Sequence, residues 1–576
     1  MTGAKITFGL YDVTAKKDSR PTSPQAASFV TMNDLKQEGV LVTKFATLEP
    51  SFFSLDGSFA PFPDTPAGMF WGLWSNVQSR EDGAFAIPPV LTIDFSTEHT
   101  SMGFTLKFYE PTGDYCNHLE IKWYDRQGYV IAQRKFTPNS ALAIIDHKVE
   151  NYKKVEIAFL STAKPCRYLK LSEIRYGAEM ILDGSKVSNA SILEEVDLLS
   201  SSVSINTLDF TMQSGTAEFS PLNPSGLFSV LQQRQKLDVT AQIDSDELPM
   251  GGFYLESWES DGKNNVKMSA VDAIGLMDKT RYDGGIYEGV TAAALVEQIM
   301  SSAGVSYTLE PSLAGVTISG CLPICTHRRA LQQVAFALDA VVDCSRGDAV
   351  KIYPKPERPT ALVSYERKFD GQALKLKPFI TGVDVVAHRY LKTAEERELF
   401  KDTLAPGSYR IEFGAPMYGL VVTGASITHA GVNYATVRVE ATGEVLLVGK
   451  EYTDSRQTVS RRLASAPPNV PPNILKVEDA TLVSASNAGA VADAVLEYHQ
   501  LRYQNDFKLR LGSERVSDML LVRSLRGENL RGMVETMDID LTGGCIASVK
   551  MVGMRVDTLS QHYAGELRAG ERTGVL

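Results

Sequence analysis

Three groups of side chains in this sequence have types and spacings that could do chemistry. The first is Cys321, Cys325 and His327, a Cys-x3-Cys-x-His pattern that looks like part of a metal site. Structural zinc sites use four protein ligands, and no fourth ligand follows at zinc spacing, so we expect no bound metal. The six cysteines are sparse and irregularly spaced. This is typical of reduced thiols in a large protein rather than of a disulfide framework.

Neighbouring carboxylates are the second group, because glycosidases work with two acidic side chains. Such pairs occur at Glu194/Glu195, Asp244/Asp246 and Asp538/Asp540. With 69 acidic residues in the chain, pairs of this kind are expected on solvated strands. The sequence has no glycine-rich phosphate loop, no Gly-x-Ser-x-Gly elbow and no His-Glu-x-x-His motif. We therefore expect a protein that is not an enzyme and that needs no cofactor.

Aromatic residues form the third group. Trp71, Trp74, Trp123 and Tyr124 fall within a run of short alternating strands between Phe62 and Gly177. Exposed aromatic rings can stack on sugars, so these four are the candidate carbohydrate-binding residues. Aromatic side chains in a small domain are also commonly core residues. The sequence leaves both interpretations open.

Composition limits the class of protein. A hydrophobic content of 44% and a charged content of 22% are ordinary for a globular chain, and no apolar run is long enough to predict a membrane helix. The net charge of −11 argues against a nucleic-acid binder, which needs a basic face. An acidic channel through which DNA passes remains compatible. The first residues lack the features of a secretory signal, so we expect synthesis and folding in a cytoplasm.

Hydrophobic periodicity predicts the elements that would position these groups. Alternating apolar residues predict strands through most of the chain, while helical spacing predicts helices within 290–304, where Gly304 is the stop, within 326–345 and within 488–499. The expected fold class is mainly β (α+β). The expected parts are a lead-in at 1–61, a β-sandwich at 62–178, a β-barrel at 179–289, a small α/β domain at 290–356, a second β-barrel at 357–473 and an α+β region at 474–576.

Two stretches carry a family resemblance. Residues 250–282 predict a strand, a turn, a second strand and a short helix, with Gly-x-Phe-Tyr from Gly251 and Ala-x-Asp-Ala-x-Gly-Leu-x-Asp from Ala270. Residues 535–544 read ETMDIDLTGG. Both resemble hub proteins of tailed-phage tail tips and baseplates, and the passage containing Leu227 and Phe228 belongs to the same match. The resemblance implies that the two expected barrels are hub barrels.

The expected sandwich resembles a galactose-binding jelly-roll, on the segments WGLWSN, TIDFS, GFTLKFYE and RYLKLSEIRYG. In that fold, ligands usually sit in loops at one end of the sandwich. The resemblance implies contact with a host glycan through Trp71, Trp74, Trp123 and Tyr124. The module could instead brace neighbouring subunits.

The hub resemblance implies a structural virion protein that joins the tail tube to the tip and gates genome passage. It implies a homotrimer that contacts tail tube, distal tail, tape-measure and tip or receptor-binding proteins, and lets DNA pass without binding it specifically. The implied location is the virion tail, after assembly in the host bacterial cytoplasm. Two alternatives stay open, a carbohydrate-binding adhesin and a tail-associated glycan-degrading protein. An adhesin leaves the barrel and the ETMDIDLTGG segment unexplained.

Overall fold

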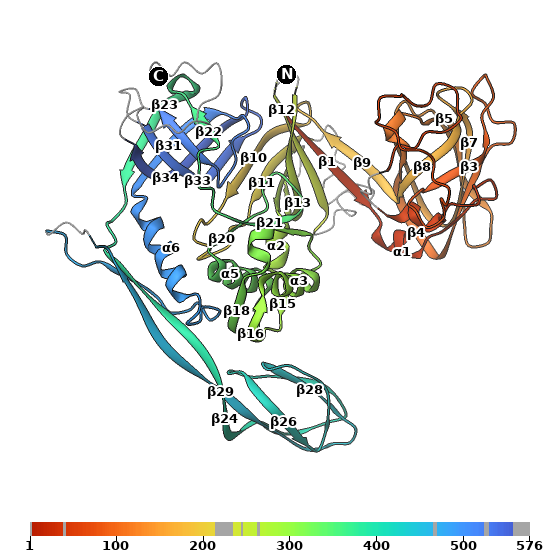
Figure 1. The fold of residues 1–576 in the computed structure, drawn as a ribbon. Helices are drawn as coiled ribbons and strands as arrows, with labels where there is room; N and C mark the ends of the chain where they lie inside the picture. Colours follow the sequence, from red (N-terminus) through yellow and green to blue (C-terminus); the bar gives the residue numbers. More distant parts are fainter. Residues whose placement is uncertain are drawn as a thin grey trace. The chain divides into compact units, whose positions relative to one another are not determined.

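The protein is mainly β and divides into two compact units in the computed structural model (Figure 1). Unit 1 comprises Met1–Ile6 and Leu182–Leu576, and unit 2 comprises Thr7–Ile181. The chain passes from unit 1 to unit 2 within β1 (Gly3–Tyr11) and returns within β9 (Gly177–Leu182). The structure describes residues 3–37, 42–213, 234–243, 246–261, 265–464, 469–523 and 529–556. Within these ranges, no helix is long and apolar enough to cross a membrane.

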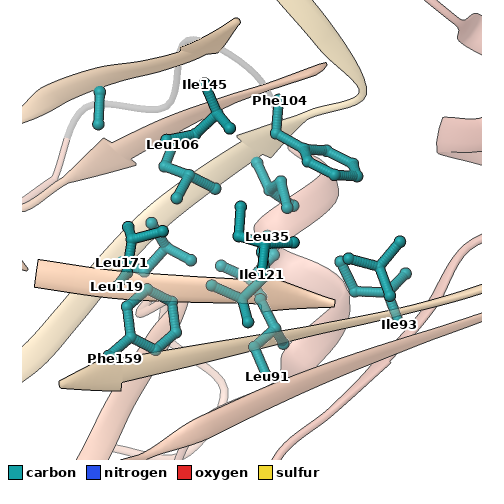
Figure 2. Packing of buried hydrophobic residues seen from close by; sticks show 14 of the residues in the cluster. Leu35, Leu91, Ile93, Phe104, Leu106, Leu119, Ile121, Ile145, Phe159 and Leu171 are labelled. Carbon is teal, nitrogen blue, oxygen red and sulfur yellow. The ribbon is translucent and has the colours of Figure 1, made fainter. Parts of the chain in front are cut away.

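Unit 2 is built on a seven-stranded sheet in the order β3-β8-β4-β7-β5-β6, with β2 on β4. From Leu119 onward every second residue of β5 is buried, namely Leu119, Ile121 and Trp123, as expected for a strand with one face on a core. Figure 2 shows how side chains from distant strands meet in that core. The strands are β2 (Arg20–Thr22), β3 (Leu73–Gln78), β4 (Val90–Phe108), β5 (Cys116–Tyr124), β6 (Val130–Phe136), β7 (Leu142–Thr162) and β8 (Tyr168–Arg175).

The residues expected to form a lead-in to the hub are instead mostly part of unit 2. Helix α1 (Val13–Asp18) and the short 3-10 helix η1 (Met32–Lys36) lie in this unit, and Leu35 packs into the sandwich core. Phe45 and Phe52 join Trp71 and Trp74 in a separate aromatic cluster. The expected boundary at residues 61/62 is therefore wrong. The reason is that these large apolar side chains find their burial against the sandwich.

Unit 1 is organised by a 13-stranded sheet in the order β23-β31-β34-β33-β10-β11-β14-β13-β12-β1-β9, with β32 on β33 and β22 on β32. Strands β10 and β33 pair antiparallel, with Ile192 opposite Ile539 and Glu194 opposite Met537. The sheet is continuous across this pair. Its further strands are β10 (Val187–Glu195), β11 (Thr207–Gln213), β12 (Lys236–Ile243), β13 (Asp246–Ser260), β14 (Asn265–Val271), β22 (Ala361–Val363), β23 (Lys368–Leu376), β31 (Tyr503–Arg510), β32 (Met519–Arg523), β33 (Asn529–Asp540) and β34 (Ile546–Val556).

The stretch at 250–282 folds as its pattern predicts. It supplies most of β13, then β14 and the short helix α2 (Ala273–Met277). Asp272 caps this helix by accepting hydrogen bonds from the backbone N–H groups of Gly275 and Asn206, at 3.1 and 3.0 Å. Burial raises the pKa of Asp272 to about 7. The Leu227–Phe228 passage lies outside the described residues.

A turn at 345–348 explains the glycine pair in this stretch. Gly251 has a φ of +104°, and a Cβ there would lie 3.1 Å from the backbone N and O of Gly347. A Cβ on Gly252 would lie 2.2 Å from a carboxylate oxygen of Asp348. Only residues without side chains let the turn approach β13 this closely.

The same turn carries Arg346, which forms a buried ion pair with Glu194 of β10. Its Nη2 donates to Glu194 Oε2 at 3.0 Å, its Nε also bonds to this carboxylate, and both side chains are 1% exposed. Burial raises the pKa of Glu194, and the facing guanidinium opposes that rise. The pair ties the turn to the main sheet beside the β10–β33 pairing.

The helices expected between 290 and 356 are present. They are α3 (Ala292–Ala303) and α5 (His327–Leu338), with the shorter α4 (Pro311–Ala314) between them. Leu295, Val296, Ile299 and Met300 are buried, as their spacing predicts, and Gly304 ends α3 in a left-handed conformation. The strands here are β15 (Arg281–Tyr282), β16 (Gly285–Thr291), β17 (Tyr307–Leu309), β18 (Thr317–Leu322), β19 (Cys325–Thr326), β20 (Ala340–Asp343) and β21 (Val350–Pro354).

In the part of 357–473 that the structure describes, the strands do not form a barrel of their own. Strands β22 and β23 join the main sheet, where they pair with strands from 503–523. Residues 382–462, here called the arm, are a long hairpin (Figure 1) of β24 (Gly382–Leu404) and β29 (Gly443–Arg462). Its tip carries β25 (Gly407–Glu412), β26 (Met417–Thr423), β27 (Ser426–Ala430) and β28 (Tyr434–Val439). Alternation predicts strands but not which strands pair, so the insertion was missed.

After the arm, β30 (Ile474–Val477) runs parallel to the start of β24. Helix α6 (Ala488–Gln500) follows, with Val491, Ala492 and Val495 buried as their spacing predicts. These side chains pack with Val383 and Val385 of the arm's base. The base of the arm is therefore anchored in a hydrophobic core.

We predict that Arg346→Met lowers the free energy of unfolding by about 3–5 kcal/mol, because it leaves the Glu194 carboxylate buried without a partner. The double variant Glu194→Leu/Arg346→Met removes both charges and should recover most of that loss. Denaturant unfolding of the three proteins tests this. Equal losses in the single and double variants would contradict the ion pair's role.

Candidate functional site

Three of the four candidate carbohydrate-binding residues are buried. Trp71, Trp74 and Trp123 are 1%, 4% and 0% exposed. The Trp123 ring stacks on Phe104 inside the sandwich, at 6.1 Å between centroids. Tyr124 is half-buried and donates a hydrogen bond to Glu156 at 2.5 Å. The four do not form a surface platform, and the tryptophans follow the core interpretation because large aromatic side chains gain most from burial.

Trp71 is the centre of an aromatic cluster drawn mostly from the residues before the sandwich strands. Phe29, Phe45 and Phe62 surround it, with ring centroids 5.0, 5.0 and 5.4 Å away. Trp74 makes an edge contact at 5.1 Å. The indole N–H donates to the carbonyl oxygen of Pro66 at 2.7 Å, which satisfies its one polar group. The cluster holds three separate pieces of irregular chain together.

A cavity of about 610 Å³ opens beside this cluster, and it is the best candidate ligand site in unit 2. Phe53 and Phe62 remain 41% and 39% exposed, and Leu48 at its rim is fully exposed. Aromatic walls with a few polar side chains are typical of sites for small neutral ligands. None of its lining residues is charged. They are Ala27, Ser28, Phe29, Ala46, Thr47, Leu48, Phe53, Phe62, Trp74, Ser75, Asn76 and Tyr168.

Sequence reasoning missed most of this cavity. Phe29, Phe53 and Phe62 lie in segments without periodic hydrophobicity, so nothing indicated that they meet. The one available signal was the density of phenylalanine in SFFSLDGSFAPF. Of the four candidates, only Trp74 lines the cavity.

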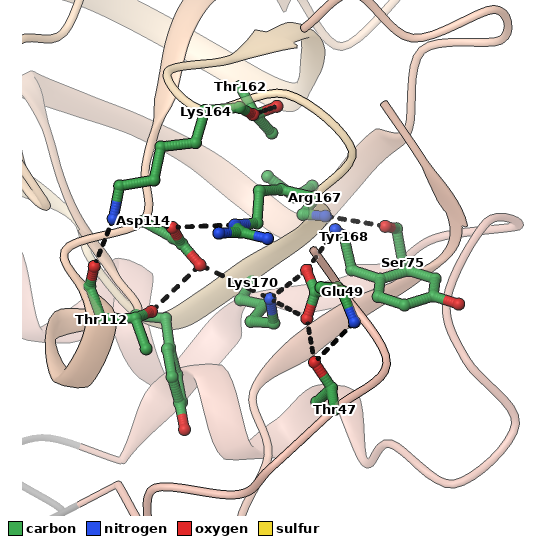
Figure 3. A network of polar contacts seen from close by, with 12 residues as sticks. Thr47, Glu49, Ser75, Thr112, Asp114, Thr162, Lys164, Arg167, Tyr168 and Lys170 are labelled. Atoms are coloured by element: carbon green, nitrogen blue, oxygen red, sulfur yellow. Dashed lines mark hydrogen bonds and ion pairs between the residues drawn. The ribbon is translucent and has the colours of Figure 1, made fainter. Parts of the chain in front are cut away.

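A buried charge network fixes one wall of the cavity (Figure 3). Lys170 Nζ lies 2.6 and 2.7 Å from the two carboxylate oxygens of Glu49, and neither side chain is exposed. Glu49 also accepts from the backbone N–H of Tyr168 at 2.8 Å and from Thr47 Oγ1 at 2.6 Å. Burial lowers the pKa of Lys170, and the Glu49 carboxylate opposes that shift. The network joins the irregular segment around Glu49 to β8.

Arg167 extends this attachment. Its guanidinium donates to the carbonyl oxygens of Pro50 and Ser51, at 2.6 and 3.3 Å, and lies 3.4 Å from Asp114. Lys170 also sits over the rings of Phe52 and Trp74, 4.2 and 5.1 Å from their centroids. The loop that presents Phe53 is therefore held by buried ionic contacts rather than by a strand ladder.

The residues of the Cys-x3-Cys-x-His pattern have ordinary structural surroundings. Both ring nitrogens of His327 are within hydrogen-bond distance of hydroxyls, those of Thr280 and Ser302 at 2.8 and 2.7 Å. Burial raises the pKa of Cys321 to about 12 and that of Cys325 to about 11. Across the described residues, no group of three or more His, Cys, Asp or Glu side chains could hold a metal. Asp244 lies outside the described residues.

No protein-family model matches the sequence, and no curated protein matches it. Among solved structures, the chain is similar to a tail protein from Neisseria meningitidis (TM-score 0.41, 9% identity, 65% of this chain and 93% of that one). It is also similar to a prophage tail protein from Shewanella oneidensis (0.39, 9%, 65% and 95%) and to prophage tail protein gp18 from Listeria monocytogenes (0.37, 10%, 65% and 91%). A likeness of this size leaves function to be argued from the chain's own residues.

We predict that Lys170→Met lowers the free energy of unfolding by about 3–5 kcal/mol, because Glu49 then stays buried without its cation. Lys164→Ala is the matched control, since Lys164 is 47% exposed and contacts the same network through Asp114 at 3.4 Å. We expect it to cost less than about 1 kcal/mol. Similar losses in the two variants would show that burial does not set the strength of this network.

Proposed function

We propose that this chain is a structural protein of a phage tail or phage-derived tail, and that unit 1 is its tail-tip hub. One observation carries the proposal. The two stretches that resemble hub proteins, 250–282 and 535–544, lie far apart in the sequence but contribute strands to one sheet. Only β10 and β11 separate β14 from β33 in the strand order.

A continuous sheet suits a mechanical role. Its backbone hydrogen bonds link strands from both ends of unit 1, so force applied to one part is borne by the others. In the proposed assembly, three copies form a ring that contacts the tail tube, distal tail, tape-measure and tip or receptor-binding proteins. The ring gates the passage of DNA, and the net charge of −11 disfavours its retention. This role needs no catalysis.

A second candidate function is glycan contact through unit 2. The observation that favours it is the uncharged, aromatic-walled cavity, whose polar lining residues are Ser28, Thr47, Ser75, Asn76 and Tyr168. Aromatic faces pack on the C–H faces of sugar rings, while hydroxyl and amide groups bond to their hydroxyls. In a tail, this contact would be with the host surface; in an adhesin, it would be the whole function.

We predict that the purified chain forms a species of three times its 63.0 kDa subunit mass. Light scattering coupled to size exclusion, over a series of concentrations, measures this mass directly. Electron microscopy of the same peak should show rings with a central opening. A chain that stays monomeric at high concentration would contradict the ring.

We predict that Phe53→Ala and Phe62→Ala each weaken binding to a glycan selected on an array by tenfold or more, because each removes one aromatic wall. Phe53 is 41% exposed and lies outside the ring contacts of Trp71, so the fold should tolerate its loss. Phe62 stacks on Trp71, so thermal unfolding of Phe62→Ala is measured beside its binding. Tyr129→Ala is the control, since Tyr129 is a 73% exposed aromatic of unit 2 that does not line the cavity. If no glycan on the array binds, the proposal of a glycan site fails while the hub proposal is untouched.

A further inference from the structure

The arm is fixed at its base, and its ladder shifts register at two places, of which the larger lies nearer the base. Strands β24 and β29 pair regularly from Gly382 to Lys392, where Lys392 lies opposite Tyr452. The next regular pair is Glu396 opposite Lys450. Residues 393–395 therefore face the single residue Glu451, which makes a bulge. Bulges interrupt the hydrogen-bond ladder and bend a strand, so this is where the hairpin is easiest to flex.

The bulge separates two regions that are held in different ways. On the base side, His388 bonds to Asp454 at 2.9 Å and to the carbonyl oxygen of Glu478 at 3.1 Å, and the core around α6 packs against the same strands. On the other side lies the tip, residues 396–451. The tip has a small core of its own around Ala435, Val437 and Leu447. It can therefore move as one piece.

The tip is fastened to the α/β part of unit 1 by two ion pairs. Arg281 Nη2 lies 2.9 Å from Glu412 Oε2, and Arg410 Nη2 lies 2.5 Å from Asp283 Oδ1. Each side of the contact contributes one cation and one anion. Arg281 and Asp283 belong to the α/β part, and Arg410 and Glu412 belong to β25 of the tip. Two such crossed pairs fix the direction of docking as well as its strength.

One buried amide completes the contact. Asn433 is 4% exposed, and its Nδ2 donates to the carbonyl oxygens of Asp283 and Leu322, both at 2.9 Å. Gly284, with a φ of +69°, leaves room for this amide, since a Cβ there would lie 2.6 Å from Asn433 Nδ2. This amide therefore fixes the tip against the carbonyl groups of Asp283 and Leu322.

The two ion pairs that hold the tip are weak because their side chains are exposed. The four charged side chains are between 37% and 63% exposed, so salt and water screen both pairs. The hydrogen bond from Arg281 helps to hold the pKa of Glu412 below its usual value, so the pairs persist at neutral pH. Besides these contacts, the tip touches the bulge region through Pro416, which accepts from the backbone N–H of Tyr452 at 3.0 Å, and through Tyr418, which donates to the carbonyl oxygen of Thr393. Few groups must therefore be undone to free the tip, whereas freeing the base would expose a hydrophobic core.

We propose that the tip, residues 396–451, is a releasable clamp: it is latched to the β15–β16 turn by Arg281, Asp283, Arg410, Glu412 and Asn433, and it swings about the bulge at 393–395 when the latch opens. This inference goes beyond the proposed function and does not depend on it. The same chain then has a docked and a released form that differ by a few exposed contacts.

Double electron–electron resonance measures the distance between two spin labels, one on the tip and one on the α/β part, and tests the clamp in the full chain. Ser426 and Ser312 are exposed, and Ser426→Cys with Ser312→Cys provides the labelling sites. Cys166 and Cys325 are changed to Ala because they are half-buried, while the other native cysteines are buried. The docked form should give one distance population at low salt. At about 1 M salt, a second and longer population should appear, because the ion pairs are screened.

Charge reversal gives the decisive comparison. Arg281→Glu/Asp283→Arg should raise the ratio of released to docked molecules by about 2- to 30-fold, the range expected for the loss of two exposed pairs, and by more through repulsion. Adding Arg410→Glu/Glu412→Arg recreates both pairs with opposite polarity and should restore the docked distance. Lys401→Glu is the control, since its pair with Glu444 at 3.3 Å lies within the tip.

Two results would overturn the clamp. A single unchanged distance in every variant and at every salt concentration would make the tip a rigid part of unit 1. A longer distance that persists in the fourfold variant would show that these charges do not form the latch. Asn433→Ala should also increase release without changing any charge.

Discussion

The pairing of β10 with β33 is the contact on which the rest of unit 1 depends. It joins strands that arise more than three hundred residues apart, and Ile192 and Ile539 are buried where they face each other. The Arg346–Glu194 pair braces the same strand from the α/β part. Because a register slip of one residue would turn these side chains to the other face, the pairing fixes the whole sheet. The arm and α6 are insertions between strands of that sheet.

Unit 2 reaches stability by other means. The core of its seven-stranded sheet is built from alternating apolar residues, but the described segments between β2 and β3 are mostly irregular. They are held by the ring contacts of Trp71 and by the buried Glu49–Lys170 pair. The consequence is a cavity whose shape is set by aromatic packing and by a buried ion pair, beside a seven-stranded sheet.

Sequence reasoning was accurate where the signal is local. It placed the strand–strand–helix unit at 250–282 and the helices α3, α5 and α6, because periodicity and capping residues act within a few turns of chain. It failed for the segment 357–473, where alternation gave strands but not partners. It also missed that Phe29, Phe53 and Phe62 converge, and it offered Trp123, which is a core residue. Burial depends on contacts that no window of sequence contains.

The sequence by itself determined that this protein is mainly β, with a small helical part, a net charge of −11 and two stretches that resemble tail-tip hubs. Local propensity and side-chain alternation are enough for that. Only the tertiary structure decided that the two stretches share one sheet, that residues 382–462 leave it as an arm, and that the aromatic residues of the N-terminal unit divide between a core and an open cavity. These outcomes depend on pairing and packing between residues that are distant in the sequence. Such contacts stabilise the fold only after the chain has lost the entropy needed to bring those residues together.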